Sequence, residues 1–212
     1  MTALREKMIE IAKRTISPDD PAHDFCHSYR VLTIAEKIAA EERADLTVLV
    51  PAALFHDLVN HPKDSPQSQS SARESADACR FILLGVDEYP KDNIPRVCDA
   101  IICHSFGTPL VPDSIEARIL QDADALEATG AIAIMRTFAS TGIMKRPFYH
   151  PQDPFAMNRH PDDHRYALDL FFTRLFKVVD HLHTQPAKRL ASQRVAFLHA
   201  FIAELRDELQ GS

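Results

Sequence analysis

The apolar residues of this chain recur every three or four positions over most of its length, which is the spacing of amphipathic helices. Only 5 glycines occur, and no region alternates apolar and polar residues long enough to predict a strand. The sequence therefore predicts an all-α protein. The expected helices run from about residue 2 to 15, 24–27 to 43, 45 onward, 71 to 84, 92 to 105, 114 past 122 and 125 to 141, with two more between 163 and 209 that are separated near Pro186.

Several residues mark where these helices begin or end. Pro51 falls inside the apolar pattern of the third expected helix, which starts at residue 45, so we expect either a kink there or a helix that begins with Pro51 in its first turn. Ser71, followed three residues later by Glu74, predicts a capping box for the fourth helix, and Gly142 is the expected stop of the seventh. Residues 142–163 are dense in proline, histidine and aromatic residues. Such a long irregular segment is typical of a lid, a binding loop or a contact between the two copies of a homodimer.

The size and charge of the chain bound what it can be. With 212 residues it can bury one full core, and we expect a single domain whose core spans about 20–150, with a helical part at about 163–209. A net charge of −6, from 24 basic and 30 acidic residues, argues against a nucleic acid polymer as the partner. We see no signal peptide and no run of roughly 20 apolar residues. The four cysteines form no CxxC pair, so we expect free thiols in a cytoplasmic protein without a membrane partner.

Four residues that can bind a metal lie on apolar helical faces. The tandem His56-Asp57 ends the apolar stretch VLVPAALFHD, His27 begins another apolar face, and Asp122 follows a third. Taken singly, a histidine here would be a core residue and an aspartate a helix cap or half of an ion pair. Burying all four is costly unless each finds a partner, and one divalent cation partners them together. Two histidines and two carboxylates without a thiolate suit Mn²⁺, Fe²⁺, Co²⁺, Ni²⁺, Zn²⁺ or Mg²⁺.

The order of these residues along the chain adds a resemblance to a known family. The segments HSYRV beginning at His27, ALFHD ending at Asp57 and ILQDAD around Asp122 resemble the HD-domain metal-dependent phosphohydrolases. The segments NHPKDS, HSF and DALEATGAI are similar to those of the small stand-alone bacterial HD hydrolases. The resemblance covers about residues 20–150. It implies an HD-fold helical bundle with one divalent metal ion in its core, bound by His27, His56, Asp57 and Asp122.

Further residues are candidates for catalysis or substrate binding beside the metal ligand Asp57. Lys63 and Asp64 lie on the loop that follows the HD tandem, so Lys63 can reach a phosphate beside the metal. His104 can protonate a leaving oxygen, bind a phosphate, join a second metal or cap its helix. Arg30, one turn after His27, can clamp a phosphate or pair with a carboxylate of the site.

Asp124 follows Asp122 by two positions, which is about 200° on an ideal helix. We therefore expect Asp124 to join the site only if the chain bends there. The resemblance implies hydrolysis of a phosphoric ester or anhydride by metal-activated water, with a small phosphorylated molecule, a nucleotide, as the substrate. HD scaffolds also host other functions, including non-catalytic ligand sensing. A metal-containing module that binds a nucleotide without turning it over is therefore the alternative.

Overall fold

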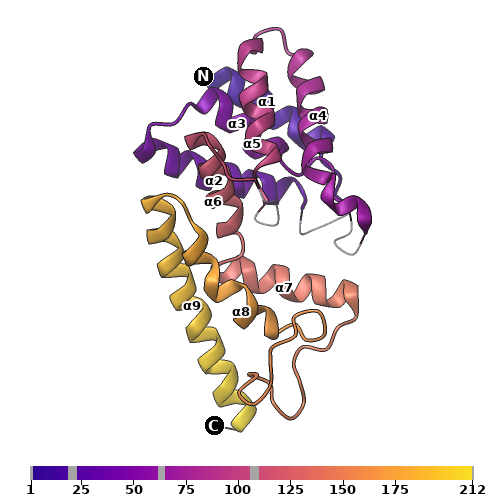
Figure 1. The fold of residues 1–212 in the computed structure, drawn as a ribbon, viewed down its shortest axis with the longest axis vertical. Coiled ribbons are helices and arrows are strands. Elements are labelled where there is room, and N and C mark those ends of the chain that lie inside the picture. Colours follow the sequence, from indigo (N-terminus) through magenta and orange to yellow (C-terminus); the bar gives the residue numbers. More distant parts are fainter. Residues whose placement is uncertain (1, 19–22, 62–64, 106–109, 212) are drawn as a thin grey trace. The chain divides into compact units, whose positions relative to one another are not determined.

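A computed structural model describes residues 2–18, 23–61, 65–105 and 110–211, and within these ranges every regular element is a helix (Figure 1). The predicted all-α class is therefore confirmed. The chain divides into two compact units, residues 1–124 and 125–212. Among the described helices, none is long and apolar enough to span a lipid bilayer. The bounds predicted for a single domain remain a prediction.

Unit 1 is built around a central helix, α3, which packs against α1, α2, α4 and α5. From Val48 to Phe55 every residue of α3 is buried. Its sequence LTVLVPAALF has no polar face, so the helix is stable only where other helices surround it. The elements of this unit are α1 (Thr2–Thr15), α2 (Phe25–Glu42), α3 (Leu46–Phe55), η1 (Pro66–Gln69), α4 (Ser71–Leu84), η2 (Lys91–Asn93), α5 (Ile94–Ile102) and most of α6 (Ile115–Leu126).

Pro51 lies inside α3 without ending it. Because proline has no amide hydrogen, the carbonyl of Thr47, four residues earlier, loses its usual helical donor. The hydroxyl of the buried Tyr89 donates to that carbonyl at 3.0 Å. The helix therefore continues through Pro51 because a side chain from outside it supplies a hydrogen bond there. A helix beginning at Pro51 is wrong, since α3 begins at Leu46 with Asp45 as its N-cap.

A polar network joins the N-terminal ends of α3, α5 and α6. Asp45 caps α3 by accepting a hydrogen bond from the amide of Thr47 at 2.9 Å. Glu116 of α6, which is buried, accepts from the amide of Asp45 at 3.0 Å. Arg96 of α5 lies 3.0 Å from the carboxylate of Asp45 and 3.4 Å from that of Glu116. These contacts fix the first turns of three helices relative to one another.

The predicted capping box of α4 is wrong by one residue. The N-cap is Ser70, whose hydroxyl donates to Glu74 at 2.5 Å. The hydroxyl of Ser71 instead accepts from the amide of His61 at 3.1 Å. Ser71 therefore holds the preceding loop rather than the helix end.

Unit 2 consists of α7 (Gly130–Met144), α8 (Asp169–Thr173), η3 (Leu175–His181) and α9 (Gln185–Gln210). The predicted stop at Gly142 is wrong, because α7 continues to Met144 and ends at Lys145 in the left-handed region, with φ 50°. One glycine costs a helix only about 1 kcal/mol relative to alanine, too little to end it. Pro186 lies in the first turn of α9, where a missing amide hydrogen costs nothing. The core of this unit consists of Ala133, Leu168, Phe171, Leu175, Leu198 and Ile202.

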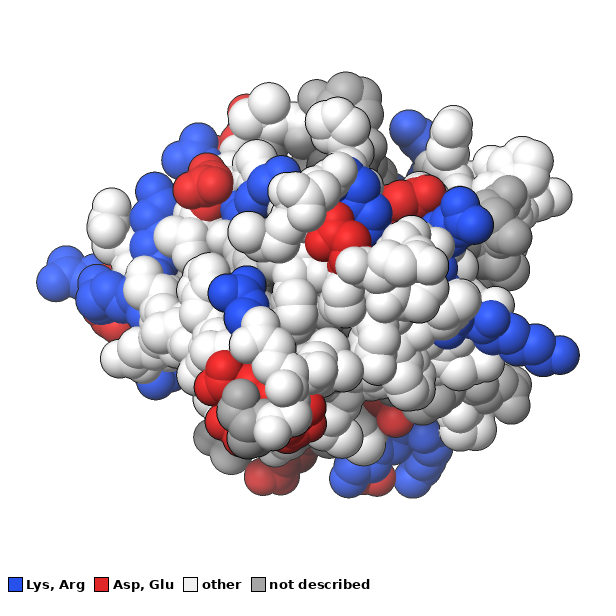
Figure 2. Space-filling view, turned by 90° about the horizontal axis from the view of Figure 1, so that it is seen from below, with Lys and Arg blue, Asp and Glu red and all other residues white. Residues whose placement is uncertain are grey.

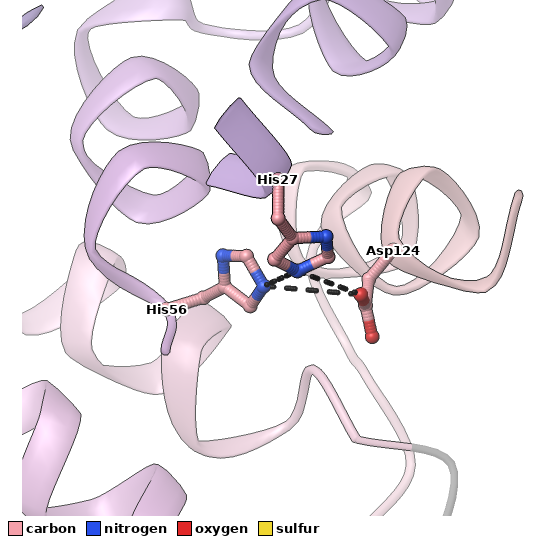
Figure 3. A group of neighbouring side chains, drawn as sticks. All are labelled: His27, His56 and Asp124. Atoms are coloured by element: carbon pink, nitrogen blue, oxygen red, sulfur yellow. Dashed lines mark hydrogen bonds and ion pairs between the residues drawn. The ribbon is translucent and has the colours of Figure 1, made fainter. Parts of the chain in front are cut away.

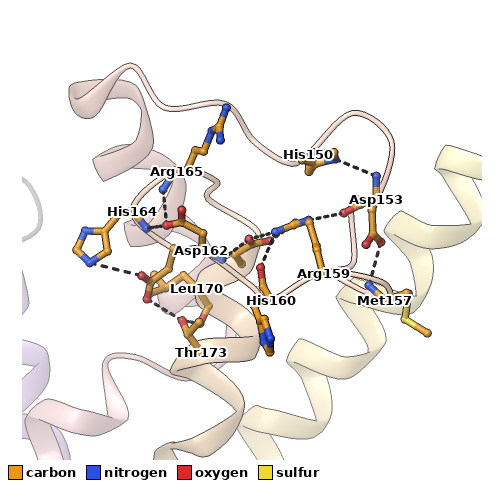
Figure 4. A network of polar contacts seen from close by, with 12 residues as sticks. His150, Asp153, Met157, Arg159, His160, Asp162, His164, Arg165, Leu170 and Thr173 are labelled. Carbon is orange, nitrogen blue, oxygen red and sulfur yellow. Dashed lines mark hydrogen bonds and ion pairs between the residues drawn. The ribbon is translucent and has the colours of Figure 1, made fainter.

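One buried carboxylate organises the irregular segment before α8. Asp169 accepts two hydrogen bonds from Arg159, at 2.5 and 2.7 Å, and one from the amide of Asp162 at 2.6 Å. Arg159 also donates to the carbonyls of Asp153 and His160 (Figure 4). A bidentate pair of this kind holds the chain in one geometry. The lid, binding loop or dimer contact predicted for this segment remains a prediction.

Candidate metal centre

Three helices of unit 1 bring two histidines and two aspartates together. His27 lies in the first turn of α2, and His56 is the C-cap of α3 with Asp57 directly after it. Asp124 lies in the last turn of α6. The Nε2 atom of His27 is 3.2 Å from Nε2 of His56 and 3.5 Å from Oδ1 of Asp124 (Figure 3). The Oδ2 atom of Asp57 is 3.6 Å from Nε2 of His27 and 3.4 Å from Nε2 of His56.

Backbone carbonyls determine which ring nitrogen two of the histidines present to the site. Nδ1 of His56 lies 2.9 Å from the carbonyl oxygen of Ala53, and Nδ1 of His104 lies 2.6 Å from that of Ile101. A carbonyl oxygen only accepts, so Nδ1 carries the hydrogen in both rings. The neutral ring of His56 then directs the lone pair of Nε2 toward a carboxylate oxygen 3.4 Å away. That contact is repulsive unless a cation, either a proton or a metal ion, lies between the two atoms.

His104 follows the end of α5 and approaches Asp57 from its other oxygen. Its Nε2 atom is 3.3 Å from Oδ1 of Asp57, whereas Oδ2 faces the other two rings. The described residues thus form two overlapping groups of possible metal ligands, one of His27, His56 and Asp124 and one of His56, Asp57 and His104. His104 is placed either to bind a metal itself or to exchange a proton one carboxylate away from it.

The charges of the site favour a cation. Burial alone would lower the pKa of His56, but Asp57 and Asp124 outweigh it and raise the pKa to about 9. Burial would raise the pKa of both aspartates, but the neighbouring histidines outweigh it. They hold the pKa of Asp57 well below its usual value and lower that of Asp124. Both carboxylates are therefore ionised near neutral pH, and a divalent cation balances their two charges.

The backbone and the spacing of the ligand atoms add to this preference. α3 ends at the site, α5 ends two residues before His104, and Asp124 lies near the end of α6. The C-terminal ends of helices carry partial negative charge, which stabilises a cation. Ligand atoms held about 2.1 Å from one ion at tetrahedral angles lie about 3.4 Å apart. The ring Nε2 atoms of His27 and His56 lie 3.2 to 3.8 Å from each other and from the nearer carboxylate oxygens of Asp57 and Asp124. These residues therefore fit a divalent ion.

The structure differs from the sequence prediction at the fourth ligand position, where Asp124 takes the place expected for Asp122. Among the described residues, the possible ligand groups include Asp124 and not Asp122. Both lie within the continuous helix α6, so no bend is needed. Asp122 is fully buried, as are its apolar neighbours Ile119, Leu120 and Ala123. Because α6 is buried from Ile119 to Leu126 except at Asp124, the apolar spacing does not single out the face that meets the histidines.

Of the three residues predicted to bind substrate, the structure describes Arg30. Lys63 and Asp64 lie outside the described residues. Arg30 is partly buried on α2, one turn after His27. His23 was not predicted for the site, but its ring packs edge-on against that of His27, with centroids 5.7 Å apart. The only signal for His23 in the sequence is its position four residues before His27, and it lies just before the N-cap of α2.

The loop that leaves Asp57 is held to α4 before it reaches those substrate candidates. The amide of Val59 donates to the hydroxyl of Ser75 at 3.0 Å, and the same hydroxyl donates back to the carbonyl of Val59 at 3.2 Å. Nε2 of His61 lies 2.9 Å from the carboxylate of Glu74. The path of the chain is therefore fixed up to residue 61.

Comparison with known proteins assigns the family. Residues 24–129 match the HD domain family, and the chain belongs to it. This range contains every possible metal ligand described above, and the predicted HD fold is confirmed. The chain is 31% identical to YpgQ of Bacillus subtilis (strain 168) over 200 residues, which cover 92% of this chain and 89% of that protein.

Solved structures of similar proteins agree with this assignment. The crystal structure of Bacillus subtilis YpgQ in complex with ADP has a TM-score of 0.74 and 30% identity, covering 98% of this chain and 97% of that chain. The crystal structure of an HD-superfamily hydrolase from Bacillus thuringiensis has a TM-score of 0.73 and 28% identity, covering 100% and 99%. The family, these relatives and the ligand groups support a metal-dependent hydrolase.

Proposed function

We propose that this protein is a metal-dependent phosphohydrolase that hydrolyses a phosphoanhydride bond of a nucleotide. The observation that carries the proposal is the convergence of Nε2 of His27 and His56 with carboxylate oxygens of Asp57 and Asp124, all within 3.8 Å of a neighbour in the set. The similarity to HD-superfamily hydrolases supports the reaction class.

We assign these four residues as the ligands of one divalent ion. When bound, the ion supplies Lewis-acid stabilisation of phosphoryl oxygens and activation of water. The two histidine side chains are fully buried, whereas those of Asp57 and Asp124 are 15% and 25% exposed. The site therefore opens to solvent on its carboxylate side, where the substrate and water enter.

We assign His104 as the proton carrier. Its Nδ1 atom is bonded to the carbonyl of Ile101, so only Nε2 is left to gain or lose a proton. A proton at Nε2 is held by Oδ1 of Asp57 at 3.3 Å, and it can pass to the leaving oxygen of a substrate placed beside that carboxylate. Asp57 then has two roles, because one of its oxygens faces the metal ligands and the other orients His104.

Support for a nucleotide comes from YpgQ, which was crystallised in complex with ADP and is similar over nearly the whole chain. Basic and acidic side chains lie side by side on the face drawn in Figure 2. The net charge of the chain is −6, which suits a small phosphorylated molecule better than a polymer of phosphates. We propose that Arg30, Lys63 and Asp64 contact the substrate; the cationic side chains of Arg30 and Lys63 suit a phosphate chain, and Asp64 directly follows Lys63 in the sequence.

The proposal is tested by loading the protein separately with each candidate divalent metal and incubating it with nucleoside and deoxynucleoside triphosphates, monophosphates and p-nitrophenyl phosphate. Phosphate and pyrophosphate are measured separately. We expect triphosphates to be hydrolysed in preference to monoesters, with little base selectivity, and His56→Ala to abolish the activity. Pyrophosphate released with a monophosphate indicates attack at the α-phosphorus, and successive release of orthophosphate indicates attack at the γ end.

Two results would contradict parts of the proposal. Efficient hydrolysis of monoesters without hydrolysis of triphosphates would remove the anhydride while leaving a phosphohydrolase. Tight nucleotide binding by the metal-loaded protein without turnover would instead favour a metal-containing sensor module.

A further inference from the structure

We infer that Gln121 is a positioning residue that holds His104 in the site. Gln121 lies on α6 three residues before Asp124, which places the two on the same side of the helix. Its side chain is buried, and Nε2 donates to the carbonyl oxygen of Cys103 at 3.0 Å. Gln121 thus connects the helix that carries Asp124 to the residue directly before His104.

The hydrogen bond acts on the peptide unit that leads into His104. The carbonyl of Cys103 and the amide of His104 belong to one planar group. Gln121 holds the carbonyl side of that group, and the amide side donates to the carbonyl of Ile101 at 3.2 Å. The same carbonyl accepts from the ring Nδ1 at 2.6 Å. The peptide and the ring are therefore both restrained, and Nε2 is directed to Oδ1 of Asp57 at 3.3 Å.

His104 lies beyond Ile102, the last residue of α5, and its amide makes a three-residue turn bond to the carbonyl of Ile101 rather than an α-helical one. Carbonyls at a helix end also need partners in any protein, so the bond from Gln121 has an ordinary structural reading. Lys91 provides the comparison. Its Nζ donates to the carbonyls of Leu83, Leu84 and Val86 at and just beyond the end of α4, at 2.7, 3.1 and 2.5 Å. Both side chains donate to carbonyls at a helix end, Gln121 once from a neutral amide and Lys91 three times from an ammonium group, but no residue of the site directly follows α4.

The test compares Gln121→Met, which keeps the length of the side chain and removes the donor, with Lys91→Met as the matched control. Both variants should unfold at slightly lower temperature and keep their metal. Gln121→Met should lower kcat about tenfold with little change in KM, because a misplaced catalytic group slows the reaction without weakening substrate binding. Lys91→Met should keep the wild-type kcat. When His104 is already replaced by alanine, Gln121→Met should lower kcat no further, because both substitutions remove the same contribution of His104 to kcat.

The kinetic arm of this test rests on the proposed function, so a second measurement reads His104 directly. Long-range ¹H–¹⁵N spectra of the histidine rings should show the His104 resonances shifted or broadened in Gln121→Met and unchanged in Lys91→Met. Unchanged His104 resonances, equal losses of kcat in the two variants, or a loss additive with His104→Ala would overturn the assignment of Gln121. If the wild-type protein hydrolyses no nucleotide, the proposed function fails, and the spectra still decide the role of Gln121.

Discussion

Replacing Asp124 with asparagine should remove most of the affinity for a divalent metal, whereas the same change at Asp122 should not. Asparagine has the size of aspartate and keeps one oxygen, but it lacks the negative charge. Oδ1 of Asp124 lies 3.5 Å from Nε2 of His27 and 3.8 Å from Nε2 of His56. Asp122 is fully buried and belongs to neither ligand group found among the described residues.

The size of the loss at Asp124 follows from two comparisons. Changing a partner of a ligand, rather than the ligand, costs about 10–100-fold in metal affinity, which sets a lower bound. Two unit charges about 4 Å apart interact by about 4 kcal/mol at an effective dielectric constant of about 20, and the amide oxygen retains part of this. We therefore expect Asp124→Asn to weaken metal binding about 100- to 1,000-fold, or about 2.7–4 kcal/mol.

Metal-dependent thermal unfolding measures this loss without an activity assay. At a metal concentration of about 100 times the wild-type Kd, the ion stabilises the wild-type protein by about 2.7 kcal/mol and Asp124→Asn by no more than about 0.4 kcal/mol. Asp122→Asn should keep the wild-type increment, even if its metal-free form is less stable. Titration calorimetry of the metal-free proteins gives Kd directly. The ligand assignment would be refuted if the metal no longer stabilised Asp122→Asn but still stabilised Asp124→Asn as it does the wild-type protein.

Three further predictions follow from particular contacts. Tyr89→Phe should lower the free energy of unfolding by about 1–3 kcal/mol, because it leaves a carbonyl of α3 without the hydroxyl that bonds to it, and urea unfolding of the two proteins checks this. Arg159→Met should cost about 3–5 kcal/mol by leaving Asp169 buried without its cation, and Arg159→Met/Asp169→Leu should restore most of it; a double variant no more stable than the single one would contradict this reasoning. The neighbouring carboxylates raise the pKa of His56 from 6.5 to about 9 in the metal-free protein, so a metal must displace its proton below that pH. The stability that this proton contributes is complete below pH 6.5 and is lost as the pH rises through 9. Metal affinity should fall up to about tenfold per unit as the pH decreases below 9, and an affinity independent of pH would show that His56 is not a ligand.

The apolar spacing of the sequence was enough to predict the all-α class, and it located α1 and α2 to within a residue or two. Local rules suffice there because a helix with one apolar face requires the same spacing in any protein. The His56-Asp57 tandem could also be recognised from the sequence, because two polar residues at the end of an otherwise apolar helix need a buried partner. Resemblance to the HD family then ordered the candidate ligands along the chain.

Tertiary packing decided the features that depend on contacts between distant segments. α3 passes through Pro51 because the hydroxyl of Tyr89 reaches the carbonyl of Thr47, a residue of that helix 42 positions earlier in the chain. His104 meets Asp57 beyond the end of α5, where no helical periodicity extends. The choice of Asp124 over Asp122 depends on how α6 is rotated about its axis. From Ile119 to Leu126 the helix is buried except at Asp124, so no apolar stripe records that rotation there, and the packing of its neighbours determines which carboxylate faces the histidines.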